Sequence, residues 1–214
     1  MGRVVEFAEF LLTVSSAFAA GADTRIIFDH NGNALISYSG SKDTLPTLTP
    51  RTQSTREDRL LASELALTTF MYVLDDSGST AYGNGHVRAE FRTEVEYSNL
   101  LGSIFRELEG ASMTYWTGTV PQTLSTEVVL SDTVKFGGPS IRVTVPAGAG
   151  ASASGSTITW SGDDDDTWYL CHIYAGWRAT SILYIGGTEH STDGEHVFGE
   201  AHTWVSACAR ARGA

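Results

Sequence analysis

Hydrophobic and polar residues alternate along much of the C-terminal half of the chain, which is the pattern of strands with one buried face. From Met113 onward, seven short segments of this kind are separated by clusters of Gly, Pro, Ser or Asp. They are residues 113–120, 126–136, 140–147, 156–162, 167–176, 180–187 and 202–211. Such a series predicts a β-sandwich or a jelly-roll-like fold.

The first twenty residues show helical rather than strand periodicity. Glu6 and Glu9 lie on one side of the predicted helix, and an apolar stripe lies on the other, formed by Phe7, Leu11, Val14 and Phe18. The run before Ala19 also resembles a secretory signal, but the two glutamates interrupt it. We expect a structural helix whose stripe is an interface, with secretion as the alternative. The segment is too short and too polar to span a bilayer.

The remainder of the N-terminal half predicts a hairpin, a strand and more helices. Residues 24–39 form two alternating runs around Asn31-Gly32, a pair that tolerates the positive φ angles of a tight turn. A capping box, Ser54 to Glu57, begins a helix whose apolar face continues to Leu74. A strand at 87–97 and a short helix at 98–110 follow.

These segments predict a mainly β protein, sandwich or jelly-roll-like, with two to three α-helices in the N-terminal half, which makes it α+β overall. A helix-bearing part (1–112) and an all-β part (113–214) are expected to form one continuous domain.

Charge narrows the range of partners. The chain has 25 acidic and 14 basic residues, for a net charge of −11. Because affinity for nucleic acid comes mostly from neutralising phosphates, we expect no direct contact with nucleic acid. Two cysteines, Cys171 and Cys208, are too few for a disulfide framework. We expect buried free thiols, and a bridge between the two stays open.

Acidic residues and histidines concentrate between residues 163 and 202. Residues 163–200 contain eight acids but a single base, Arg178. Candidate metal ligands in this stretch are His190, Asp193, Glu195, His196 and His202. None of them has the spacing of a known metal motif, so we expect no metal and no cofactor. Asp163 to Asp166 are expected to form a solvated turn that joins two strands into a hairpin.

No motif for nucleophilic catalysis is present, because the chain lacks a GxSxG elbow. Cys171 and His172 are neighbours on a predicted strand and so point to opposite faces. We therefore expect no enzyme activity. A hydrolase that uses acids and histidines of 163–202 is one alternative.

The aromatic residues support a second alternative. Of five tryptophans, Trp177 lies in a Gly-Trp-Arg turn and is expected to be exposed as an interface residue. Residues 167–187, TWYLCHIYAGWRATSILYIGG, resemble the paired strands of laminin-G and concanavalin-A-like sandwiches, although Gly186 stands where those sequences have Asp. The resemblance implies a carbohydrate-binding, lectin-like module, often with calcium.

The leading hypothesis is a structural assembly protein of a virion, such as a capsid, protrusion or tail subunit. A sandwich without a catalytic motif and with an apolar helical stripe would act through contacts with copies of itself or with other structural subunits. Its location would be the virion or another assembled particle, and the extracellular medium if the chain is secreted.

Overall fold

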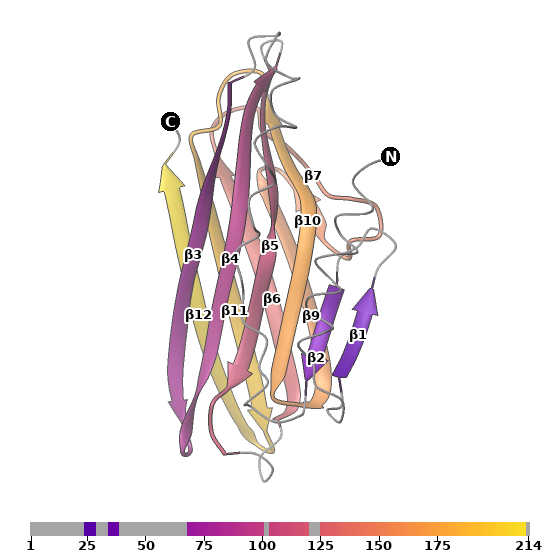
Figure 1. Ribbon diagram of the computed structural model, residues 1–214, viewed down its shortest axis with the longest axis vertical. Coiled ribbons are helices and arrows are strands. Elements are labelled where there is room, and N and C mark those ends of the chain that lie inside the picture. The colour runs from indigo at the N-terminus through magenta and orange to yellow at the C-terminus, as the bar shows by residue number, and fades with distance from the viewer. Residues whose placement is uncertain (1–23, 29–33, 39–67, 101–102, 120–124, 213–214) are drawn as a thin grey trace, which may run out of the picture.

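The described part of the chain is a sandwich of two antiparallel β-sheets. The computed structural model describes residues 24–28, 34–38, 68–100, 103–119 and 125–212. These residues contain twelve strands and no helix. The long strands run along the long axis of the molecule, with one sheet in front of the other (Figure 1).

Sheet A contains seven strands in the order β1-β2-β10-β5-β4-β3, with β7 paired to one part of β10. Their bounds are Thr24–Phe28 (β1), Ala34–Tyr38 (β2), Thr68–Tyr82 (β3), Gly85–Leu100 (β4), Ser103–Trp116 (β5), Arg142–Thr144 (β7) and Tyr169–Ser181 (β10). Strands β3, β4 and β5 form a meander, and β10 then pairs with β5 although more than fifty residues separate them.

Sheet B contains five strands in the order β12-β11-β6-β9-β8. Their bounds are Ser125–Gly137 (β6), Ser152–Ser154 (β8), Thr157–Thr167 (β9), Gly187–Phe198 (β11) and Ala201–Arg212 (β12). The chain crosses between the sheets after β5, β6, β7, β9 and β10, so each sheet is assembled from distant segments. This crossing is typical of sandwich folds.

The core lies between the sheets and follows from the period of two in each strand. On β6, Val128, Leu130 and Val134 are fully buried, whereas Glu127 and Lys135 are exposed. Leu108 and Val95 of sheet A join the same cluster. Each such aliphatic side chain contributes about 1.5–3 kcal/mol when it is removed from water.

Strand β10 is buried on both faces from Tyr169 to Tyr174. Its pairing with β5 shifts between Tyr174 and Trp177, and Gly176 at this irregularity has a φ of 70°. A β-bulge of this kind bends the strand and redirects the side chains that follow it. As a result Trp177 points into the core and is fully buried.

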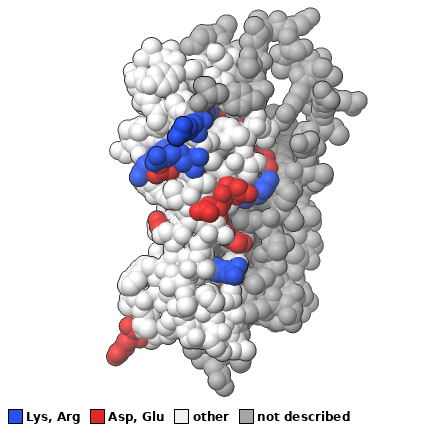
Figure 2. Space-filling model, turned by 90° about the vertical axis from the view of Figure 1, so that its left-hand side faces the viewer, with Lys and Arg blue, Asp and Glu red and all other residues white. Residues whose placement is uncertain are grey.

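The edge strands β3 and β12 meet at one side of the sandwich. Thr80 Oγ1 donates a hydrogen bond to the carbonyl of Trp204 (2.8 Å), and the Cys208 amide donates to Asp76 Oδ2 (2.8 Å). A Cβ on Gly78 would lie 2.0 Å from the carbonyl oxygen of Ser206, so glycine permits this close approach. Figure 2 shows this side, where acidic and basic side chains lie next to one another.

The expectation of a mainly β protein is confirmed by the two antiparallel sheets. Within the hairpin expected at 24–39, β1 and β2 pair in antiparallel fashion, and residues 29–33 lie outside the described residues. The helix expected at 98–110 is wrong, because these residues belong to β4, its connection and β5. Ile104 and Leu108 are four residues apart, which is one helical turn but also two strand periods. The helix expected to end at Leu74 is also wrong over residues 68–74, which form the start of β3. The helix expected in the first twenty residues, and residues 54–67, lie outside the described residues.

Most of the predicted C-terminal strands are present, with three corrections. Residues 182–186 form a loop rather than a strand, and β11 was not predicted as a strand at all. Asp163 to Asp166 are not a hairpin turn. They lie within β9, where Asp163 to Asp165 pair with β6 and Asp166 has a φ of 52°, and the chain then crosses at Trp168 to the other sheet. The boundary expected at residue 112 falls inside β5.

Among the described residues, no helix has the length and apolar character needed to cross a membrane.

Candidate functional site

Four of the five predicted metal-ligand candidates are on β11, where they lie on opposite faces of the strand. His190 and His196 point inward and are fully buried, whereas Asp193 and Glu195 point outward. His202 on β12 is exposed and pairs with Glu195 at 2.7 Å. The five candidates therefore do not converge, and no group of three or more His, Cys, Asp or Glu in the described part of the chain is arranged to hold a metal ion.

A polar network lies between the sheets around Asp132 of β6. The carboxylate has no solvent exposure and accepts four hydrogen bonds. Two go to Oδ2, from Ser112 Oγ (2.6 Å) and His172 Nδ1 (2.7 Å). Two go to Oδ1, from Thr192 Oγ1 (2.7 Å) and His190 Nε2 (3.2 Å). Because Ser112 and His172 belong to sheet A and Asp132 to sheet B, the network links the two sheets.

The network continues through His190. Its Nδ1 lies 2.6 Å from Thr93 Oγ1, and the same hydroxyl lies 2.6 Å from the Tyr174 hydroxyl. Burial raises the pKa of Tyr174, so its hydroxyl remains protonated and can donate. A consistent arrangement has Tyr174 donating to Thr93, Thr93 donating to His190 Nδ1, and His190 Nε2 donating to Asp132.

His172 is held between a carboxylate and an aromatic ring. Its imidazole stacks on Trp160 with ring centroids 3.5 Å apart and an interplanar angle of 8°. Its Nδ1 is bonded to Asp132, but its Nε2 is buried with no hydrogen-bond partner. Trp160 is the inward residue of β9, so the stack is a second link between the sheets.

The electrostatics of the network favour an ionised Asp132. Burial alone raises the pKa of this carboxyl, but the hydrogen bonds from His172 and His190 outweigh it and hold the pKa well below its ordinary range. A buried carboxylate of this kind is stable only while its donors remain in place.

This geometry does not form a nucleophilic triad. Ser112 donates to Asp132 and not to a histidine, so it lacks the serine–histidine contact of a triad. Asp132, His172 and His190 are at most 1% exposed, so a substrate could not reach them in this conformation. The network's demonstrable role is to tie the sheets together.

His196 occupies a second, separate buried position. Its Nδ1 lies 2.8 Å from Ser125 Oγ, and its Nε2 lies 3.1 Å from Thr114 Oγ1. Burial lowers the pKa of His196 to about 3, so the ring is neutral at physiological pH. The contact between His196 and Thr114 joins the two sheets, and the Thr114 hydroxyl donates in turn to the Arg88 carbonyl (2.9 Å) within sheet A.

The strongest surface anomaly is the loop between β10 and β11. Ile182, Leu183 and Tyr184 follow one another and are 74%, 58% and 55% exposed. The residue after them, Ile185, is buried. Three consecutive large apolar side chains in solvent form an exposed patch, which we call the apolar loop.

The apolar loop is fastened from beneath by Arg106 of β5, whose side chain is almost fully buried. The guanidinium donates from Nη2 to the Ile185 carbonyl (2.7 Å) and from Nη1 to Tyr72 OH (2.8 Å) and Thr188 Oγ1 (2.5 Å). The Gly186 amide also donates to the Gly137 carbonyl (2.5 Å). These bonds fix both the loop's far end and the start of β11.

A second exposed aromatic lies at the other end of sheet B. Trp204 is 61% exposed on β12, and its ring is nearly parallel to that of His202, with centroids 5.6 Å apart. Trp204 lies directly opposite Glu195 in the β11–β12 register. Of the five tryptophans it is the exposed one, whereas Trp177 is fully buried, so the prediction of Trp177 as an exposed contact residue is wrong.

Other predicted residues are placed as follows. The apolar stripe of Phe7, Leu11, Val14 and Phe18 lies outside the described residues. Cys171 and Cys208 are both free thiols, the first buried and the second exposed, so only Cys171 matches the expectation of a buried thiol.

Sequence reasoning missed Asp132 and Arg106. Asp132 occupies an inward position in an alternating strand, between Leu130 and Val134, and that position was the available signal. Arg106 was hidden because its segment was interpreted as a helix.

No protein-family model matches this chain, and no curated protein matches it at a significant level.

Proposed function

We propose that this chain is a structural assembly protein, such as a capsid, protrusion or tail subunit of a virion, and that it acts through protein–protein contacts. The observation that carries the proposal is the apolar loop, Ile182 to Tyr184, at the end of the sandwich. Its partners would be copies of this chain or other structural subunits.

The exposure of an apolar run to water is unfavourable, and a protein contact would relieve it. Burying large apolar side chains lowers the free energy by about 25 cal/mol for each Å² removed from water. Contiguous exposed apolar patches on soluble proteins commonly mark interaction sites. Tyr184 is also of a residue type that is enriched at the buried centre of interfaces.

The buried fastening by Arg106 supports the same interpretation. A loop that is already held in one conformation loses little conformational entropy when it binds. Arg106 and Thr188 are buried and hydrogen-bonded to each other, so the base of the loop is rigid. The chain thus presents its apolar side chains on a fixed support.

Light scattering on the full chain tests the proposal. We expect the wild-type protein to have a mass of several chains, and Leu183→Glu to reduce it to that of one chain, 23.0 kDa. Met71→Glu is a matched control, because Met71 is an exposed apolar residue on the outer face of β3 and 40% exposed. A wild-type protein with the mass of one chain at all concentrations would contradict self-assembly, as would full assembly of Leu183→Glu.

A carbohydrate-binding function is the second candidate, and Trp204 favours it. An exposed aromatic ring beside carboxylates can stack on a sugar while Glu195 accepts hydrogen bonds from its hydroxyls. A glycan array with the wild-type protein and with Trp204→Ala, each with and without EDTA, tests this candidate. Binding that Trp204→Ala abolishes would support it, and no binding by the wild type would remove it.

A further inference from the structure

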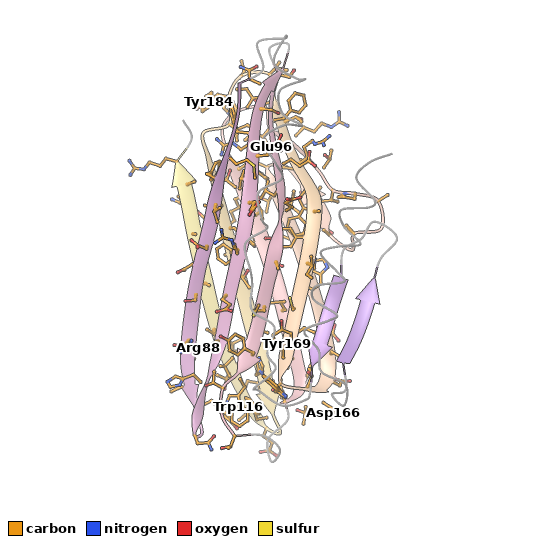
Figure 3. The ribbon with its side chains drawn as sticks, viewed as in Figure 1. Arg88, Glu96, Trp116, Asp166, Tyr169 and Tyr184 are labelled. Carbon is orange, nitrogen blue, oxygen red and sulfur yellow. The ribbon has the colours of Figure 1, made fainter. Side chains whose placement is uncertain are left out.

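The two ends of the sandwich differ in chemistry. Tyr184 lies at one end of the long axis, and Trp116 and Asp166 lie at the other (Figure 3). Because the strands run along this axis, the register of sheet B assigns further residues to each end. We call these the Tyr184 end and the Asp166 end.

The Tyr184 end combines the apolar loop with positive charge. Residues 187 and 212 pair where β11 begins and β12 ends, and Glu189 lies between Arg210 and Lys135 in the next outward row. The exposed basic side chains of the strands that reach this end are Lys135, Arg142, Arg210 and Arg212. Glu189 is the carboxylate in this row, and Arg210 pairs with it. Sheet A adds the exposed Glu96, which Figure 3 also shows near this end.

The Asp166 end combines an exposed aromatic ring with negative charge. On the outer face of sheet B, one row across the strands reads Trp204, Glu195, Val129, Asp163, and Asp165 lies opposite Glu127 beyond it. The acidic side chains of this end are Glu127, Asp163, Asp164, Asp165, Asp166, Glu195 and Glu200. Arg88 is the basic residue that Figure 3 places near this end.

The same polarity is visible on the side formed by β3 and β12. In Figure 2 the basic side chains lie mostly in the upper half, interspersed with acidic ones, whereas the charged side chains visible toward the lower end are acidic. Charge is therefore distributed unevenly along the long axis.

We propose that copies of this chain associate head to tail, with the apolar loop of one copy packed against Trp204 and the acidic rows at the Asp166 end of the next. This inference rests on the proposed function and specifies its partner and geometry. Contacts between two Asp166 ends would place carboxylates together, which costs free energy, whereas contacts between opposite ends place Arg210 and Lys135 near carboxylates.

The aromatic residues fit the centre of such a contact. Trp and Tyr dominate the energetics of protein interfaces, and here each end supplies one, Trp204 and Tyr184. The charged rows would surround them as a rim, where they steer and orient the approach of the second copy.

A head-to-tail contact has a consequence for assembly. Each copy uses one end for each neighbour, so a bound pair still has two free ends. Association therefore continues into a ring or an open filament, and does not stop at a dimer. The mass of the wild-type protein should accordingly rise beyond two chains with concentration.

A complementation experiment tests the geometry. Leu183→Glu disables the Tyr184 end, and Trp204→Ala with Asp165→Lys disables the Asp166 end. We expect each variant alone to have the mass of one chain. Mixed in equal amounts they should form a two-chain complex, because each retains the end that the other lacks. Asp75→Lys, an exposed charge reversal midway along β3 and away from both ends, is the control and should assemble as the wild type does.

The outcomes separate this inference from the proposed function. If the wild type assembles but the Trp204→Ala/Asp165→Lys variant also forms complexes alone, the contact joins two Tyr184 ends and the head-to-tail arrangement is wrong. If both variants are single chains and their mixture stays so, the arrangement is also wrong. If the wild type itself does not assemble, the proposed self-assembly fails first. Thermal melting of both variants near the wild-type temperature shows that the results do not arise from unfolding.

Discussion

Asp132 on β6 and His172 on β10 lie 2.7 Å apart, Oδ2 to Nδ1, and they join the two sheets through a contact that solvent does not reach. His190 on β11 bonds the other carboxylate oxygen. The core therefore contains a directional polar link in addition to its apolar contacts. Polar links in a core need every partner in place, because each unsatisfied buried group costs about 1–3 kcal/mol.

Asp132→Asn tests this link. The amide replaces one acceptor oxygen with a donor, which then faces the hydroxyl and imidazole N–H groups that bonded the carboxylate. We expect the free energy of unfolding to fall by about 3–5 kcal/mol, as when one partner of a buried ion pair is removed. Urea denaturation measures the loss. The control is Asp193→Asn on the outer face of β11, which should change stability by less than about 0.5 kcal/mol.

The two variants also test which face of sheet B supports the fold. Equal losses in Asp132→Asn and Asp193→Asn would show that the buried network has no special importance.

Acid should destabilise the protein through His196. Burial lowers the pKa of His196 to about 3 from the ordinary 6.5. Above pH 6.5 the ring is neutral in the folded and the unfolded protein, so its contribution to the free energy of unfolding is at its maximum. Below that pH the unfolded chain takes up a proton that the folded protein does not, so the free energy of unfolding falls by about 1.4 kcal/mol for each pH unit until roughly pH 3. Asp132 acts in the same direction only below about pH 4, as its depressed pKa requires.

Two variants isolate this dependence. In His196→Gln, the slope of the free energy of unfolding against pH should be smaller by about 1.4 kcal/mol per pH unit between pH 6 and 4.5, which is the contribution of one proton. Ser125→Ala removes the hydroxyl that contacts Nδ1 but retains the ring, so it should lower stability at every pH and leave the slope nearly intact. An unchanged slope in His196→Gln would show that another group causes the acid dependence.

The strands could be predicted from the sequence where alternation was clean, as on β6, whose inward residues are Val128, Leu130 and Val134. Alternation failed as a guide on β5, because Ile104 and Leu108 satisfy both the helical and the strand periods. It failed on β11 for another reason. Most of the inward residues there, Thr188, His190, Thr192 and His196, are polar, so the strand does not look amphipathic although its inward side is buried.

The seam between β3 and β12 predicts a strong effect at Gly78. Gly78→Ala would place a Cβ 2.0 Å from the Ser206 carbonyl oxygen, so one of the two backbones must move. We expect a loss of about 1–3 kcal/mol. Faster hydrogen exchange at the Cys208 amide, which Asp76 holds at 2.8 Å, would show that the seam has opened. Ser79→Ala, an exposed neighbour, is the control, and the prediction fails if both variants exchange alike.

The apolar loop could be predicted only in part from the sequence. Residues 180–187 were interpreted as a strand because Ile182, Leu183 and Tyr184 form a continuous apolar run. A run of this kind is equally compatible with a buried strand and with an exposed contact loop. The difference is decided by tertiary partners, above all by Arg106, which lies more than seventy residues earlier and bonds Ile185.

Arg106→Met tests whether the support of the apolar loop matters for assembly. Arg106 is 1% exposed, so its side chain does not touch a partner directly. Methionine keeps much of the side-chain volume but loses the hydrogen bonds to Ile185, Tyr72 and Thr188, which should cost about 2–4 kcal/mol. We expect limited proteolysis at residues 182–186 to accelerate and the assembled mass to fall at temperatures where the sandwich is still folded. Arg92→Met is the matched control, because Arg92 lies on the outer face of β4 and pairs with Asp75 at 3.6 Å. Assembly that persists in Arg106→Met while the loop is cleaved faster would show that a rigid loop is not required for the contact.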